Sequence, residues 1–194
     1  MERLFYGIPL ATAPGRVFNP RPATEALVEA ALARLDGLPM RVADVGTGTG
    51  ALAIALAKLS PNAEIWATDI NPDAVELARA NVARHGLEQR VHVLEGNLLE
   101  PVPVPVDLVV ANLPYLAEST KYDARHIPYN EEPETAVYAP GDGLDPYRGL
   151  LRACETGRLV AGGKVLIQFH GHVLEADCWA LDSLRRLLEA ERAA

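Results

Sequence analysis

The sequence has little of what marks secreted or membrane proteins. Its two cysteines, Cys154 and Cys178, are too few for a disulfide framework. No apolar run approaches the ~20 residues of a membrane-spanning helix. The first ten residues, MERLFYGIPL, contain charges instead of an apolar signal-peptide core. We therefore expect a cytoplasmic protein with reduced thiols and no membrane contact.

A basic surface is also missing. The net charge is −8, and residues 51–150 account for it, with fifteen acidic against seven basic side chains. Proteins that bind nucleic acids usually carry a basic stripe that displaces counterions from the phosphates. Its absence argues against DNA or RNA as the main partner.

What the sequence does contain is an alternation of short apolar runs with longer helical segments, over 194 residues that suit about one domain. The apolar runs predict buried strands at residues 40–45, 64–70, 90–96, 106–112 and 164–170. Continuous apolar runs are typical of a parallel sheet covered on both faces. Strands that alternate with helices predict an α/β fold, Rossmann-like and doubly wound, with a mostly parallel sheet.

Helix signals lie between and after these strands. Residues 24–35 carry an apolar stripe, and Asn71-Pro72 and Asp145-Pro146 are typical helix starts. The run PVPVPV at 101–106 predicts a stiff connector. A final helix is predicted by apolar residues at helical spacing, namely Leu174, Cys178, Leu181, Leu184 and Leu188.

Ligands of such sheets bind beyond the carboxyl ends of the strands. The first of these ends is followed by Gly46, Thr47, Gly48, Thr49 and Gly50. Glycines there allow a tight turn and bring backbone amides against a ligand at a helix start. The G-x-G-x-G spacing differs from the G-x-G-x-x-G of nicotinamide-dependent oxidoreductases. The loop alone is also compatible with a plain strand-to-helix turn.

Two further strand ends carry polar residues. Asp69 suits a ribose diol, because a carboxylate accepts two hydroxyl hydrogen bonds; alternatively, Asp69 or Asn71 only caps the next helix. Asn97 could meet an adenine edge while Leu98 packs on the ring, or the two are a turn residue and a core residue.

The fourth strand ends in Asn112-Leu113-Pro114-Tyr115. Pro114 offers no N–H and pushes Leu113 towards an extended conformation, so that the Leu113 carbonyl can face the crevice. The carbonyl oxygens of Asn112 and Leu113 would then grip an NH2 group, with Tyr115 as a flat wall. The alternative is a loop with a buried Asn. His170, His172, Asp177 and Cys178 lack a zinc spacing, so we expect no metal.

Together, DVGTGTG, Asp69 and NLPY resemble Rossmann-like S-adenosyl-L-methionine-dependent methyltransferases that act on a planar NH2 nitrogen. The resemblance implies the class I methyltransferase fold. It also implies cofactor contacts from Gly46 to Gly50 and from Asp69, Asn97, Leu98 and Asn112. DNA adenine-N6, rRNA adenine and protein glutamine-N5 methylases share tetrads of the Asn-Pro-Pro-Tyr type, so NLPY alone does not choose among them.

The flanking segments resemble the HemK family of protein glutamine-N5 methyltransferases. FYGIPLATAPGRVFNPRPATEALVE (5–29) matches the segment before the fold, and EEPETAVYAPGDGLDPYRGL (131–150) matches the segment after the tetrad. This implies methyl transfer from S-adenosyl-L-methionine to a glutamine side chain, with a peptide-chain release factor as the protein partner. The catalytic and substrate-binding residues would be Asn112, Leu113, Pro114 and Tyr115.

The chain also departs from the family. No helical domain precedes residue 5, and Gln168 replaces a family Glu. We expect a segment at 1–36 that packs on a methyltransferase domain at 37–194, in a sheet short of its C-terminal hairpin. The insertion at 118–145 has seven acidic and two basic residues and is either a solvated loop or a cover for a basic protein surface. An adenine-N6 methyltransferase and a non-catalytic S-adenosylmethionine-binding domain remain alternatives, and the oligomeric state is open.

Overall fold

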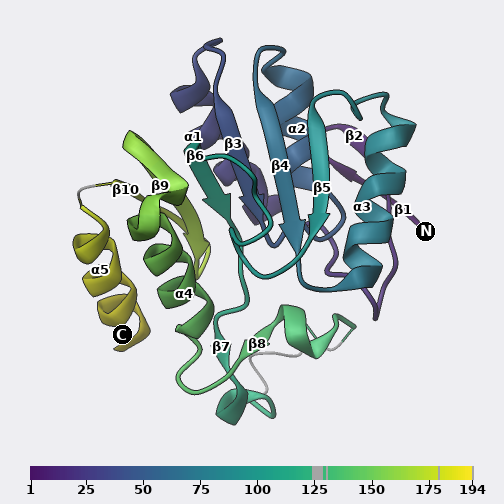
Figure 1. Ribbon diagram of the computed structural model, residues 1–194. Coiled ribbons are helices and arrows are strands. Elements are labelled where there is room, and N and C mark those ends of the chain that lie inside the picture. The colour runs from purple at the N-terminus through teal and green to yellow at the C-terminus, as the bar shows by residue number, and fades with distance from the viewer. Residues whose placement is uncertain (124–128, 130, 179, 194) are drawn as a thin grey trace.

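The computed structural model describes residues 1–123, 129, 131–178 and 180–193. Six strands form one sheet in the order β10-β9-β6-β3-β4-β5 (Figure 1). In chain order the helices and strands are β1 (Glu2–Phe5), β2 (Ile8–Ala11), α1 (Glu25–Leu35), β3 (Arg41–Val45), α2 (Ala51–Leu59), β4 (Glu64–Asp69), α3 (Pro72–Arg84), β5 (Val91–Glu95), β6 (Val106–Ala111), β7 (Leu116–Ala117), β8 (Tyr138–Ala139), α4 (Asp145–Ala153), β9 (Leu159–Phe169), β10 (His172–Asp177) and α5 (Leu181–Ala193). The predicted doubly wound α/β fold is confirmed.

Five strands of the sheet run in the same direction. β3 pairs in parallel with β4 and β6, β4 with β5, and β6 with β9, while β10 is antiparallel to β9. The carboxyl ends of β3, β4, β5 and β6 therefore meet at one edge of the sheet. The small β7–β8 pair lies beyond this edge (Figure 1).

Each face of the sheet has its own apolar core. One core gathers buried residues of α1, α2 and α3, and the other gathers residues of α4 and α5. Helix α2 shows why it lies in the interior: its sequence ALAIALAKL is apolar almost all round, and its first seven residues are buried. Full burial of a side chain such as Ile54 contributes about 1.5–3 kcal/mol.

The N-terminal residues share the first core. β1 and β2 form an antiparallel hairpin that places Phe5 and Leu10 in the core with α1 and α2. The buried Asn81 of α3 accepts from the Ala11 N–H at 2.8 Å and donates to the Ala11 carbonyl at 3.0 Å. These contacts join the hairpin to α3.

The C-terminal prediction is wrong in part. Leu174 and the residues around it form β10, paired as Leu174↔Ile167, and the helix begins only at Leu181. His170 and Gly171 have φ of 48° and 82°, so the chain reverses tightly after β9. The spacing of Leu174 and Cys178 fits a helix, but strand pairing with β9 satisfies the backbone here. β10 covers the edge of β9 that was expected to be bare, and β10 is the last strand of the sheet on this side.

Within the described part of the chain, no helix combines the length and apolar character needed to cross a membrane.

Candidate active site

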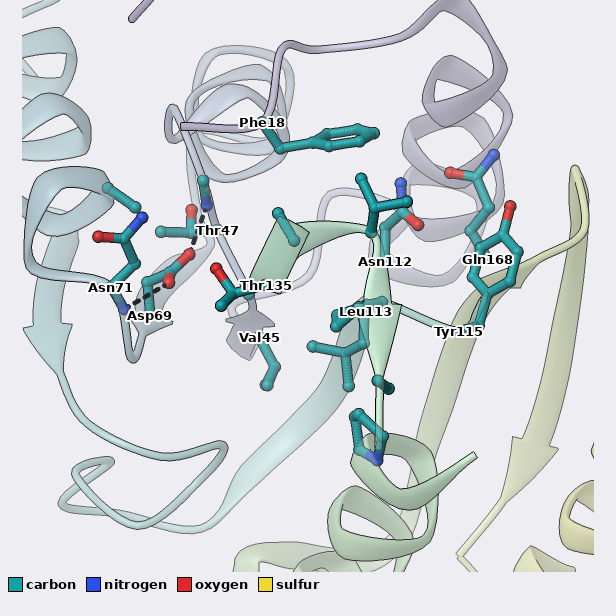
Figure 2. Close-up of a pocket in the computed structure, with 18 of the residues that line it drawn as sticks. Phe18, Val45, Thr47, Asp69, Asn71, Asn112, Leu113, Tyr115, Thr135 and Gln168 are labelled. Carbon is teal, nitrogen blue, oxygen red and sulfur yellow. Dashed lines mark hydrogen bonds between the residues drawn. The ribbon is translucent and has the colours of Figure 1, made fainter. Parts of the chain in front are cut away.

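A cavity of about 1080 Å³ opens at the carboxyl edge of the parallel strands. Figure 2 shows Thr47, Asp69 and Asn71 on one side of it and Asn112, Tyr115 and Gln168 on the other. The predicted residues that line it are Gly46, Thr47, Gly48, Thr49, Asp69, Asn97, Leu98, Asn112, Leu113, Pro114 and Tyr115. The topology thus brings the ends of four strands into one site, whereas Gly50 packs towards Ala78 of α3.

The glycine loop after β3 is a tight turn that packs on the NLPY tetrad. Gly46 and Gly48 have φ of 75° and 56°, where only glycine is unstrained. A Cβ on Gly46 would lie 2.8 Å from Cδ2 of Leu113. The amides of Gly46 and Thr47 both donate to the Thr68 carbonyl at 2.9 Å. At these two positions the expectation that loop amides face a ligand is wrong, and the loop instead supplies a close backbone approach.

Asp44, at the start of the DVGTGTG motif, is a site residue that sequence reasoning missed. It is buried, lines the cavity and accepts two hydrogen bonds on Oδ2, from the Thr47 hydroxyl at 2.6 Å and the Ala53 N–H at 3.1 Å. Burial raises the pKa of Asp44 to about 7, although both hydrogen bonds lower it. With a pKa near neutral pH, the Asp44 carboxyl can lose its proton when a cation enters the cavity and keep it when an anion does.

Asp69 and Asn71 have separate roles at the end of β4. The Asn71 side chain caps α3 by accepting from the Asp73 N–H at 3.0 Å. Asp69 accepts from the Gly48 N–H on Oδ2 and the Asn71 N–H on Oδ1, both at 2.9 Å. Burial raises the pKa of Asp69, and these amides oppose the shift. A carboxylate has about four acceptor positions, so Asp69 retains capacity for a ligand, and its ribose role stays a prediction.

Asn97 and Leu98 lie where the third parallel strand ends. The Asn97 amide donates to Oε1 of Glu100 at 2.8 Å. Leu98 has a φ of 49°, and its carbonyl accepts from the Thr68 hydroxyl at 2.8 Å. A Cβ on Gly149 of α4 would lie 2.9 Å from Cδ1 of Leu98, so this side chain packs directly against α4. The adenine roles of both residues stay predictions.

Asn112 is oriented by a residue from the PRPATE motif. Its side-chain nitrogen donates to the Thr24 hydroxyl at 3.1 Å. Thr24 is buried in a short 3-10 turn, Pro22–Thr24, directly before α1. With its nitrogen directed to Thr24, Asn112 keeps Oδ1 as an acceptor. Sequence reasoning matched Thr24 to the family motif but assigned it no function.

Tyr147 of α4 supports the tetrad from the other face of the sheet. Its fully buried hydroxyl accepts from the Leu113 N–H at 3.1 Å. The same hydroxyl lies 2.6 Å from the Gln168 carbonyl and 3.0 Å from the Leu113 carbonyl. A hydroxyl carries one hydrogen, so it can donate fully to one carbonyl only, and the Gln168 carbonyl is the nearer.

Tyr115 forms an aromatic wall. Its ring centroid lies 5.1 Å from that of Phe169 and 4.9 Å from that of His170. Burial raises the pKa of Tyr115, so the phenol stays neutral. A Cβ on Gly143, which has a φ of 92°, would overlap the Tyr115 carbonyl oxygen. This explains why the GDGLD stretch has glycine at this position.

Residues before α1 and after the tetrad meet at the cavity. Arg21 forms an ion pair with the buried Glu132 at 2.7 Å, and Glu132 also accepts from the Asn19 N–H at 2.9 Å. The Arg21 guanidinium lies over the rings of Phe18 and Tyr129, at 5.4 and 5.3 Å from their centroids. These contacts join the two segments that carry the HemK-like motifs.

Many acidic side chains of the insertion at 118–145 form ion pairs with basic side chains of this chain. Besides Glu132, Glu134 pairs with Lys121, while Asp142 and Asp145 both pair with Arg148. Positions 124–128 and 130 lie outside the described residues. Four of the seven acidic residues therefore have ion-pair partners in this chain, and two of these partners, Arg21 and Arg148, lie outside the insertion. If 118–145 covers a basic protein surface, four of its carboxylates are already paired with basic side chains of this chain.

Comparison with known proteins gives a consistent result. The model of the methyltransferase small domain family matches residues 19–127. The chain is 43% identical over 162 residues to a release factor glutamine methyltransferase of Deinococcus radiodurans, over 81% of this chain. It is 38% identical over 174 residues to one of Escherichia coli, over 87% of this chain. The matches span 55% and 60% of those relatives' lengths.

A solved structure supports the fold assignment. The crystal structure of ribosomal protein L11 methylase from Lactobacillus delbrueckii subsp. bulgaricus superposes with a TM-score of 0.57 and 26% identity. The superposition covers 92% of this chain and 72% of the other.

Proposed function

This chain belongs to the methyltransferase small domain family, and we propose that it transfers a methyl group from S-adenosylmethionine to a glutamine side-chain nitrogen of a peptide-chain release factor. The relatives named release factor glutamine methyltransferase support this substrate. The observation that carries the proposal is the orientation of Asn112, whose nitrogen is directed to Thr24 while Oδ1 remains an acceptor at the cavity.

The residues around the cavity fit S-adenosylmethionine. The cofactor carries a sulfonium and an ammonium, and the buried carboxyl group of Asp44 and the partly buried carboxyl group of Asp69 line the cavity beside the glycine loop. Asp69 would accept from the ribose hydroxyls, while Asn97 and Leu98 would hold the adenine. A Cβ on Gly46 would lie 2.8 Å from Leu113. The glycine loop, where the cofactor would bind, therefore has no room for a side chain between it and the tetrad, where the acceptor would bind. When bound, S-adenosylmethionine supplies an electrophilic methyl group.

The tetrad would bind and orient the acceptor. An amide nitrogen is a poor nucleophile because its lone pair is shared with the carbonyl group, so positioning must supply much of the catalysis. Asn112 Oδ1 and the Leu113 carbonyl would accept the two amide hydrogens and direct the lone pair of the nitrogen. The same dipoles stabilise the positive charge that develops on nitrogen. Tyr115 would form one wall of the slot and exclude water.

The adenine-N6 alternative is less well supported. The charged residues that line the cavity are acidic at Asp44, Asp69, Glu118, Glu134 and Asp145 and basic at Arg21, Lys121 and Arg152. An excess of acids disfavours a phosphate backbone near the acceptor site. A non-catalytic S-adenosylmethionine-binding domain would not require an oriented Asn112.

The proposal is tested by labelled-methyl transfer to purified release factor, with mass-spectrometric mapping of the methylated residue. We expect one N5-methylglutamine, and we expect Asn112→Ala to abolish transfer while S-adenosylmethionine affinity stays within about tenfold. Adenine-containing RNA and DNA are assayed in parallel. Methylation of adenine instead of glutamine would contradict the proposal, and so would binding of the cofactor without transfer to any acceptor.

A further inference from the structure

The side chain of Gln168 is buried, and its amide oxygen is an unsatisfied acceptor among the described residues. Gln168 is only 4% exposed, yet it lines the cavity. Its Oε1 is buried and has no hydrogen-bond donor among the described residues. A buried acceptor without a donor is costly, so a group that enters the cavity is the natural source of that donor.

Strand pairing sets Gln168 beside Asn112. The parallel ladder of β6 and β9 ends with the pair Ala111↔Ile167, and the next residue on each strand is Asn112 or Gln168. Residues at matching positions of neighbouring parallel strands project to the same face, about 4.8 Å apart. Figure 2 shows the two amide side chains close together on the same side of the cavity.

The main chain at this position is held independently of the side chain. The hydroxyl of Tyr147, a residue of α4, lies 2.6 Å from the Gln168 carbonyl. Leu166, two residues earlier on β9, belongs to the opposite core, which α1 shares. The Gln168 side chain therefore points away from Tyr147, to the side where Thr24 holds Asn112.

We propose that Gln168 is a substrate-contacting residue whose Oε1 accepts an N–H of the acceptor carboxamide, next to Asn112. This inference rests on the proposed function. The terminal torsion of a glutamine is broad and roughly two-fold, so the amide can turn towards the acceptor without moving the rest of the side chain. The Tyr147 hydroxyl lies 3.0 Å from the Leu113 carbonyl, which is also the proposed acceptor for one amide hydrogen. The Gln168 oxygen would share with this carbonyl the amide hydrogen that Asn112 Oδ1 does not accept, and its dipole favours the nitrogen as positive charge develops.

The experiment compares Gln168→Met, which keeps the length of the side chain and removes its polar atoms, with Gln168→Glu, which keeps an acceptor oxygen. We expect Gln168→Met to lower kcat/KM for release factor by about 10- to 100-fold. Affinity for S-adenosylmethionine and the urea unfolding midpoint should be unchanged. Gln168→Glu should restore kcat/KM to within about threefold of wild type, which a purely space-filling role would not produce.

A second measurement locates the contact on the acceptor. Binding of release factor is measured with S-adenosylhomocysteine present, using the natural acceptor glutamine and a glutamine-to-methionine variant. In the wild-type enzyme the acceptor change should weaken binding, and in Gln168→Met it should do so by at least about fivefold less. Equal losses in both enzymes, or wild-type kcat/KM in Gln168→Met, would overturn the inference and leave the proposed function intact. Failure of the wild-type enzyme to methylate glutamine would overturn both.

Discussion

The Asn112 side chain donates to the Thr24 hydroxyl across 3.1 Å, although the two residues are 88 positions apart in the chain. Thr24 ends the segment that precedes α1, and Asn112 follows β6. An asparagine side chain offers a donor and an acceptor at nearly equal positions. Thr24 thus defines which end of the amide remains for a substrate, and it does so from a segment outside the parallel sheet.

Removing the Thr24 hydroxyl should therefore reduce methyl transfer. In Thr24→Val the Asn112 amide loses its partner and can rotate, so we expect kcat to fall about tenfold, equivalent to about 1.4 kcal/mol. Affinity for S-adenosylmethionine, measured by calorimetry, should change little. Thr24→Ser keeps the hydroxyl and should retain most of the wild-type rate. Equal activity of the valine and serine variants would show that Asn112 is oriented by other groups.

Substitution of Asp69 addresses cofactor binding. Asp69→Ala removes the carboxylate that accepts from the Gly48 and Asn71 amides and is predicted to bind the ribose. We expect S-adenosylmethionine to bind about 1–3 kcal/mol more weakly in titration calorimetry, because hydroxyl partners are left unpaired. Asp73→Ala, beside the helix cap and away from the predicted ribose site, serves as the control. Unchanged affinity in Asp69→Ala would refute the ribose role.

The Tyr147 hydroxyl should contribute measurably to stability. Tyr147→Phe keeps the ring in the core but leaves the Leu113 N–H and the Gln168 carbonyl without their buried partner. We expect the free energy of unfolding in urea to fall by about 1–3 kcal/mol. Tyr122→Phe is a matched control, because Tyr122 is 94% exposed and should be neutral. An unchanged free energy of unfolding in Tyr147→Phe would mean that other groups form hydrogen bonds with the Leu113 N–H and the Gln168 carbonyl.

Asp44 predicts a pH dependence of stability with a defined sign. Its pKa in the folded protein is about 7, above its value of 3.8 in the unfolded chain, so the folded state keeps the proton longer. Folding is therefore progressively disfavoured as pH rises from about 4 to about 7, and the penalty is complete above pH 7. Asp44→Asn removes this penalty, and its Oδ1 can accept from Thr47 and Ala53 as Oδ2 does now.

The test is urea unfolding of the cofactor-free protein at several pH values. We expect Asp44→Asn to be about 1–4 kcal/mol more stable than wild type at pH 8, with the difference vanishing near pH 4. A constant difference across this range would show that ionisation of Asp44 is not involved.

Local patterns were enough to predict most of the sheet. β3, β4, β5 and β6 begin and end within one residue of their predicted bounds, since each is a short apolar run with a turn signal after it. Asn71 caps α3 as expected, because a cap depends only on neighbouring residues. The prediction for the C-terminal segment was wrong because the spacing of Leu174 and Cys178 fits both a helix and a strand. Pairing with β9 decided for the strand.

The sequence by itself determined the α/β fold, the glycine loop, Asp69 and the NLPY tetrad, because each is encoded within a few neighbouring residues. Only the tertiary structure decided how these parts are held. It placed Thr24 against Asn112, Tyr147 under Leu113 and Gln168 beside the acceptor side of the cavity. These contacts join residues far apart in the chain, and no local period or spacing encodes which distant side chains meet.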